Sequence, residues 1–126
     1  MKVVTLRQPE ATAVVLGLAR CLWRSRPLAY RGPLLVHAAA DRPGSRDRAK
    51  YPGLDPDTLP YGAILGVVDV MGCVPDGAGC GYEWYLADPR PLPEPCLCKG
   101  QWGLWRPPAG LLLALRAADA GDRKGR

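Results

Sequence analysis

The sequence predicts an α+β domain built on a small curled or closed β-sheet of five to six short strands, with one early helix and one C-terminal helix. Three observations favour this class. Glycine and proline together contribute 29 of the 126 residues, about twice their average share, which is typical of turn-rich β-proteins. Short apolar runs recur along the chain, and helical spacing of apolar residues occurs in only two places. The length fits one domain, which we place over residues 1–126.

The first strand and the first helix follow one another directly. Val3–Leu6 is a short β-branched run that predicts a strand. Pro9 fits the first position of a helix of about ten residues, with apolar residues along one face and Gly17 marking its end. We expect two further strands in this half of the chain, over Cys21–Arg24 and Gly32–Ala38.

The strand that we expect to be central lies in the second half of the chain. Gly62–Cys73 is an almost continuous apolar run, and Gly66 within it favours a bend or bulge at a corner of the barrel. Before it, residues 41–60 mix charges with prolines and glycines. They predict a surface connection with at most one helical turn, around residues 46–50. After it, Pro75–Gly81 predicts a loop.

The C-terminal third combines extended segments with a final helix. Glu83–Ala87 predicts a strand, and alternating prolines keep Asp88–Pro95 extended because they forbid a helix. A last strand is expected near Gly103–Arg106. Prolines 107 and 108 then open a helix that is expected to continue through about Ala118. A short charged tail follows from about residue 119.

Composition predicts a cytoplasmic protein without a membrane segment. No apolar run approaches the roughly 20 residues that a bilayer crossing needs. Arg7 and Glu10 come too early in the chain for a secretory signal. The cysteines are five, an odd number, so we expect mostly reduced thiols rather than a disulfide framework. Their spacing does not match the usual spacing of zinc ligands, and we expect no metal and no cofactor. The five are Cys21, Cys73, Cys80, Cys96 and Cys98.

Charge is distributed unevenly along the chain. Residues 1–50 hold ten Lys/Arg and three Asp/Glu, whereas residues 51–105 hold two and seven. Between Ala11 and Ala40 there is no acidic residue, and four arginines fall within twelve positions. Such a stretch attracts polyanions, nucleic acids among them. Alternatively, these arginines are solvated and pair with the acidic middle of the folded chain. The four are Arg20, Arg24, Arg26 and Arg31.

The start of the first helix is a candidate anion site. Arg7, Gln8 and Pro9 precede the helix, and the unpaired N–H groups of a helix N-terminus can receive a phosphate. Alternatively, Gln8 caps its own helix while Glu10 complements the helix dipole.

Two tryptophans lie beside cationic residues, as is typical of proteins that stack bases and neutralise phosphates. Trp23 precedes Arg24, and Trp102 follows Lys99 closely. Because side chains alternate along a strand, we expect Trp23 and Arg24 to face opposite sides. His37 is the only histidine, so a Cys-His or Ser-His catalytic device would have to use it. Its place in a strand favours a half-buried residue with satisfied hydrogen bonds.

These motifs together resemble an ASCH domain, a PUA-like module that is found widely in bacteria. The resemblance spans nearly the whole chain. It implies a β-barrel with helices packed at its ends, and a positively charged cleft beside the Gln-Pro helix for RNA or single-stranded nucleic acid. It rests on Leu6–Pro9, Gly17, Arg24–Ser25, Tyr30–Gly32, Gly62–Asp69, Lys99–Gly100 and Gly103–Trp105.

The family signature, Gly-x-Lys-x-x-Glu-x-Arg, is only half retained. An ungapped alignment on Gly17 and Arg24 places Ala19 at the lysine position and Leu22 at the glutamate position. Relatives similar to bacterial acetylcytidine amidohydrolases use that lysine, a hydroxyl residue at the glutamate position and a further acid. Arg20 cannot replace the lysine as a base because its guanidinium stays protonated. Asp69 is the nearest candidate for the further acid, and we expect it to be a structural carboxylate.

The sequence therefore predicts a nucleic-acid-binding module rather than an enzyme, with RNA slightly preferred over DNA. The alternative is a hydrolase, either a ribonuclease or an acetylcytidine amidohydrolase, that uses His37, Asp69 or Lys99. A third possibility is a protein-interaction module that uses the proline-rich strip Pro89–Pro95. The predicted binding residues are Arg7, Gln8, Pro9, Trp23, Arg24, Arg31, Lys99 and Trp102.

Overall fold

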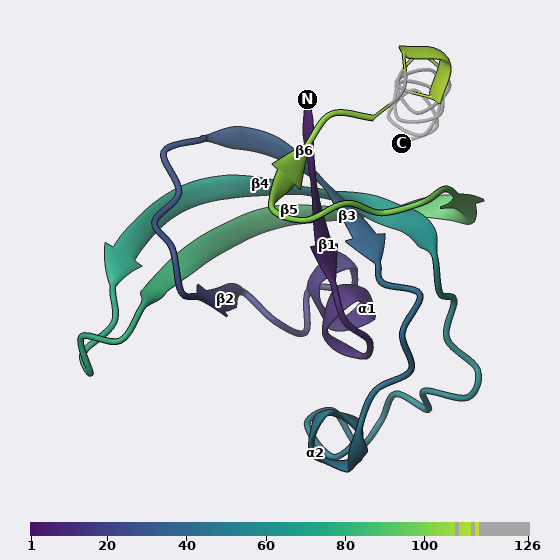
Figure 1. Cartoon of the computed structure of the whole chain (residues 1–126), viewed down its shortest axis with the longest axis horizontal. Helices are drawn as coiled ribbons and strands as arrows, with labels where there is room; N and C mark the ends of the chain where they lie inside the picture. The colour runs from purple at the N-terminus through teal and green to yellow at the C-terminus, as the bar shows by residue number, and fades with distance from the viewer. Residues whose placement is uncertain (108, 112, 114–126) are drawn as a thin grey trace.

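The protein folds around one curled, six-stranded mixed sheet that forms a half-barrel (Figure 1). The computed structural model describes residues 1–107, 109–111 and 113. The strand order is β2-β5-β4-β3-β1-β6, so β2 and β6 are the two edges. The strands are β1 (Lys2–Leu6), β2 (Cys21–Arg24), β3 (Gly32–Ala38), β4 (Ala63–Pro75), β5 (Tyr82–Leu97) and β6 (Leu104–Trp105), and the helices are α1 (Glu10–Val15) and α2 (Ser45–Arg48).

The predicted α+β class and the central position of the Gly62–Cys73 segment are confirmed. β4 lies between β3 and β5, and both pairings are antiparallel. β1 pairs with β3 in parallel. Parallel strands need a long crossover connection, and here residues 7–31, which include α1 and β2, provide it. The larger core cluster joins α1 to the sheet and includes Val14, Leu34 and Val68. A second, smaller cluster includes Leu35 and Ile64.

Helix α1 is shorter than predicted. It has six residues rather than about ten, and Pro9 precedes it instead of occupying its first position. The Gln8–Pro9 peptide bond is cis. Leu16 caps the C-terminus, and Gly17 adopts a φ of +79°, a conformation that glycine reaches without steric cost. Gly17 therefore ends the helix as predicted.

Gly66 produces the predicted irregularity in β4. A Cβ atom at this position would lie 2.6 Å from the carbonyl oxygen of Arg90 and 2.9 Å from the Cα of Pro91. The pairing register of β4 with β5 shifts between Ile64 and Gly66. The proline-rich segment, which was expected only to be extended, forms part of β5, and its Arg90 and Pro91 pair with Val67 and Gly66 on one side of this bulge.

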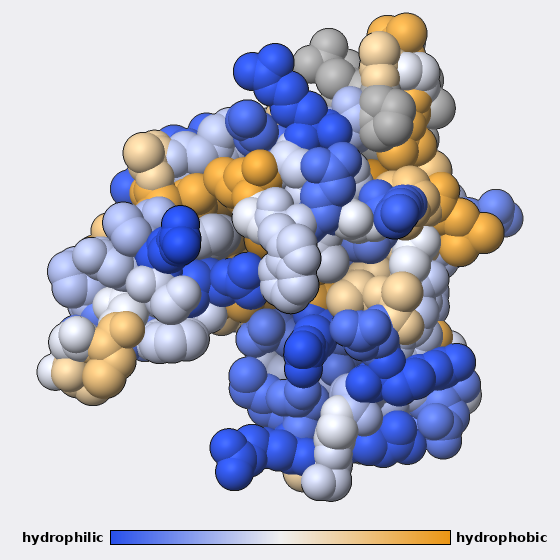
Figure 2. All heavy atoms as spheres, viewed as in Figure 1, coloured by the Kyte–Doolittle hydropathy of each residue, from blue (hydrophilic) through white to orange (hydrophobic). Residues whose placement is uncertain are grey.

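The remaining segments agree with the prediction where the structure describes them. α2 corresponds to the helical turn expected around residues 46–50, and the surface around it is mostly hydrophilic in Figure 2. Residues 109–111 and 113 are helical. The rest of the helix predicted through Ala118, and the tail predicted from about residue 119, lie outside the described residues. Among the described residues, no helix is long and apolar enough to cross a membrane.

Candidate nucleic-acid interface

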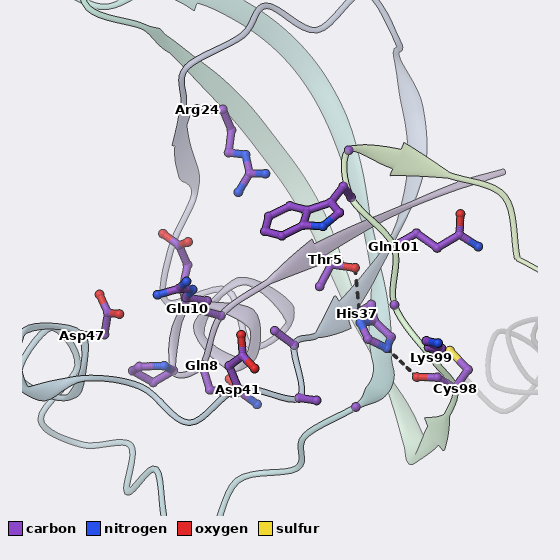
Figure 3. Close-up of a pocket in the computed structure, with 18 of the residues that line it drawn as sticks. Thr5, Gln8, Glu10, Arg24, His37, Asp41, Asp47, Cys98, Lys99 and Gln101 are labelled. Carbon is purple, nitrogen blue, oxygen red and sulfur yellow. Dashed lines mark hydrogen bonds between the residues drawn. The ribbon is translucent and has the colours of Figure 1, made fainter.

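A cavity of about 520 Å³ lies beside the start of α1 (Figure 3). Four separate parts of the chain line it. They are residues 5–10 from β1 to α1, residues 37–41 at the end of β3, the connection that carries α2, and residues 98–103 between β5 and β6. Arg24, at the end of β2, completes the lining. The fold therefore brings together segments from both halves of the chain.

The structure brings six of the eight predicted binding residues to this cavity: Arg7, Gln8, Pro9, Arg24, Lys99 and Trp102. Trp102 is 98% exposed, an unusual state for so large an apolar ring. The guanidinium of Arg24 lies 5.9 Å from the centroid of the Trp84 ring, a cation–π contact that orients it. Arg7 and Lys99 make no ion pair with any residue that the structure describes.

Trp23 and Arg31 lie outside this cavity. The indole Nε1 of Trp23 donates a hydrogen bond to Oδ2 of Asp76 at 2.6 Å. This bond lowers the pKa of the Asp76 carboxyl below its ordinary value. Trp23 does not share the cavity with its neighbour Arg24, as strand alternation predicted. The guanidinium of Arg31 is also engaged, because its Nη1 donates to the carbonyl oxygen of Leu28 at 2.7 Å.

Gln8 lines the cavity, but both polar atoms of its side-chain amide are hydrogen bonded within the protein and are not available to an anion. Its side chain is buried, and its Nε2 donates to the carbonyl oxygen of Pro60 at 2.8 Å. Its Oε1 accepts a hydrogen bond from the backbone N–H of Thr12 at 3.0 Å. Gln8 thus caps its own helix, which was one of the two interpretations of the sequence. The Thr12 N–H, which an anion at this helix start could otherwise bind, is therefore already bonded to Gln8.

His37 has satisfied hydrogen bonds, as predicted from its place in a strand, but it is fully buried rather than half-buried. Its Nε2 donates to the carbonyl oxygen of Cys98 at 2.7 Å, because a carbonyl can only accept. Its Nδ1 therefore accepts from the Thr5 hydroxyl at 3.3 Å (Figure 3). The Thr5 oxygen accepts in turn from Nε1 of Trp105 at 3.1 Å. This chain of bonds connects β1, β3 and β6 with the segment that follows β5.

Gly100 allows the chain to pass directly over this network. A Cβ atom at this position would lie 2.7 Å from Cε1 of His37, 2.9 Å from its Nδ1 and 3.0 Å from the hydroxyl of Thr5. A side chain would force the backbone away from the sheet. The sequence contained one signal for this contact, the Lys99–Gly100 pair that contributes to the ASCH resemblance, but nothing in it identified the partner.

The resemblance implied a positively charged cleft, and the cavity contains both basic and acidic residues. Its basic residues are Arg7, Arg24, Lys50 and Lys99, and its acidic residues are Glu10, Asp41 and Asp47. Lys50 pairs with Glu10 at 3.4 Å. Sequence reasoning missed Asp41, Asp47 and Lys50. All three belong to the connection over residues 41–60, whose charges are typical of any surface loop.

Of the three candidates for hydrolytic chemistry, His37 and Lys99 line the cavity and Asp69 does not. Asp69 Oδ1 accepts a hydrogen bond from Nη2 of the buried Arg90 at 3.2 Å and does not line the cavity, so it is a structural carboxylate as expected. Ala19 and Leu22, the residues aligned with the lysine and glutamate of the family signature, do not line the cavity either. Leu22 is buried in the core, and Ala19 packs against the same core. Among the described residues, no three His, Cys, Asp or Glu side chains form a group able to hold a metal ion.

No protein-family model matches the sequence, and no curated protein matches it. Solved structures match the fold. ASCH from Zymomonas mobilis has a TM-score of 0.63 and 14% identity, and the match covers 92% of this chain and 93% of that one. A tyrosine-to-phenylalanine mutant of ZmASCH from the same organism has a TM-score of 0.62 and 14% identity, with 92% and 96% covered. The chain therefore has the small α+β fold of ASCH proteins.

Proposed function

We propose that this chain is a nucleic-acid-binding module that receives RNA or single-stranded nucleic acid in the cavity beside α1. The observation that carries the proposal is the exposed Trp102 in the lining of a cavity that also contains Arg7, Arg24 and Lys99. An exposed indole can stack a base, a contact that contributes about 1–3 kcal/mol. The cations can neutralise the adjacent phosphates.

The size of the cavity and the likeness of the fold support the same class of ligand. A volume of about 520 Å³ lies in the usual range of small-molecule pockets, about 300–1,000 Å³. It suits one nucleotide, with the rest of the strand outside. ASCH proteins share the fold, and the family resemblance implies RNA or single-stranded nucleic acid as the ligand.

Filter binding of short single strands over a range of salt concentrations tests the proposal. Arg24→Ala and Lys99→Ala are each expected to weaken binding and to flatten the plot of log affinity against log salt by about 0.7 per lost phosphate contact. Trp102→Ala is expected to weaken binding without changing that slope. Arg26→Ala and Arg46→Ala are matched controls, because both arginines are exposed and lie outside the cavity.

The absence of binding at low salt would refute the proposal. A hydrolase that uses His37, Asp69 or Lys99 is the alternative, and incubation with RNA and with acetylated cytidine separates the two. A binding module leaves both intact, whereas a hydrolase turns one of them over. Binding is favoured because both ring nitrogens of His37 are hydrogen bonded and Asp69 is paired with Arg90.

A further inference from the structure

Two acidic groups in the lining of the cavity, Asp41 and Asp47, have side chains without a hydrogen bond or ion pair among the described residues. Asp47 belongs to α2, and Asp41 belongs to the segment that follows β3. Figure 3 shows the Asp41 carboxylate, just beyond the end of β3, pointing into the cavity. Glu10, in the same lining, is paired with Lys50 at 3.4 Å. Asp41 differs, because its side chain makes no hydrogen bond or ion pair with any part of the chain that the structure describes. The phosphate-binding role proposed above gives this carboxylate no function, since it repels phosphate.

The chemistry of the carboxylate defines what it can recognise. An ionised carboxylate only accepts hydrogen bonds, so the ligand must present an N–H or O–H group to it. Cytosine, adenine and guanine carry an exocyclic amino group and uracil does not, and Asp or Glu accepting from cytosine N4 is a recurrent specific pairing. Uracil carries a carbonyl oxygen at that position, and this oxygen would meet the carboxylate with like partial charge.

We propose that Asp41 makes the cavity selective for bases that carry an exocyclic amino group, so that cytosine is preferred over uracil. This inference rests on the proposed function. Trp102 stacks the face of the base, Arg24 and Lys99 contact phosphates, and Asp41 accepts a hydrogen bond from the edge of the base. Proteins that recognise single-stranded RNA use the same contacts: an unstacked base stacks on an aromatic side chain and is hydrogen bonded along its Watson–Crick edge.

Short oligocytidine and oligouridine strands of equal length provide a matched test, because they have the same backbone charge. The wild-type protein is expected to bind the cytidine strand about tenfold more tightly at the same salt concentration. The two salt slopes are expected to be equal, because the phosphate contacts are the same. Strands that carry one adenine or one hypoxanthine are a second matched pair, and the adenine strand is expected to bind more tightly.

Asp41→Asn tests the residue itself. Asparagine keeps the shape but presents both a donor and an acceptor, so it no longer selects against a carbonyl. The preference for cytidine is expected to disappear, chiefly because the uridine strand binds more tightly once the negative charge is removed. A merely structural role for Asp41 would weaken both strands together and would leave their ratio unchanged.

Asp47→Asn and Glu94→Gln are the controls. Asp47 lines the same cavity and Glu94 is an exposed residue of β5 outside it, and both variants are expected to keep the preference for cytidine. Equal binding of the two strands by the wild type would overturn the selectivity and leave the binding function intact. A preference that survives Asp41→Asn, or that Asp47→Asn also abolishes, would overturn the assignment to Asp41. If neither strand binds at low salt, both proposals fail.

Discussion

The ring of His37 donates a hydrogen bond to the carbonyl oxygen of Cys98 at 2.7 Å, across 61 positions of sequence. The donor belongs to β3, near the middle of the sheet, and the acceptor follows β5. Lys99 follows Cys98 directly and Trp102 lies three residues further on, and both line the cavity. The bond therefore fixes the start of the segment that carries two of the proposed binding residues.

Replacing His37 is expected to destabilise the protein and to weaken nucleic-acid binding. His37→Ala leaves the Cys98 carbonyl without this donor and the Thr5 hydroxyl proton without an acceptor, and it opens a cavity, at a cost of about 2–4 kcal/mol in the free energy of unfolding. Urea denaturation measures this cost. His37→Gln is the matched variant, because its amide can donate to the Cys98 carbonyl, and it is expected to recover part of both losses. Equal stability of His37→Ala and the wild type would contradict this role.

Gly100→Ala is expected to weaken binding by displacing the segment over residues 99–103. The added Cβ would lie 2.7 Å from the ring of His37, so the backbone must move away from the sheet. Gly53→Ala is the control, because nothing lies within 4 Å of a Cβ at that position. Filter binding and thermal denaturation of both variants measure the effect. A Gly100→Ala protein that binds like the wild type would show that this contact does not position the site.

Trp23→Phe is expected to raise the pKa of the Asp76 carboxyl toward its ordinary value of 3.8, because the variant removes the indole N–H that lowers it. In the wild type, a lowered pKa stabilises the fold above pH 3.8, and this contribution is lost as the pH falls through the folded-state pKa. An NMR titration of the Asp76 carboxyl carbon measures the shift. Trp102→Phe, the control, is expected to leave it unchanged, and an unshifted titration in Trp23→Phe would contradict the contact.

Cys98 is expected to react slowly with iodoacetamide. Burial, with a smaller contribution from Cys96, raises the pKa of its thiol above 9.0, and the thiolate is the reactive form. Exposed Cys21 and Cys80 are expected to be modified first. Because Cys98 lines the cavity, a bound single strand should slow its modification further. Peptide mass spectrometry follows each site, and a Cys98 that reacts as fast as Cys80 at neutral pH would be the contrary result.

Most of the fold was predictable because its signals are local. The apolar run around Val67 identified the central strand, and glycines at 17 and 66 marked a helix end and a bulge that their backbone geometry confirms. The length of α1 was overestimated. Apolar spacing continues through Leu18, yet Leu16 and Leu18 are exposed beyond the end of the helix. Periodicity records which residues are apolar, and tertiary packing decides which of them remain helical.

The site was less predictable because its members come from distant segments. Neighbouring cations and aromatic rings identified Arg24, Lys99 and Trp102, which line the cavity. The same reasoning selected Trp23, whose strand position sends its indole to Asp76 instead. Asp41 carried no signal, since a single aspartate in a charged connection is ordinary. Its position became visible only when the fold placed it in the same cavity as the cations.

Ultraviolet cross-linking of a short single-stranded RNA, followed by peptide mass spectrometry, locates the bound strand on the protein. We expect cross-links within residues 98–103, at Trp102 or Lys99, and their loss when excess unlabelled strand is added. Cross-links confined to Trp23 or Arg31, with none in the lining of the cavity, would contradict the proposed site.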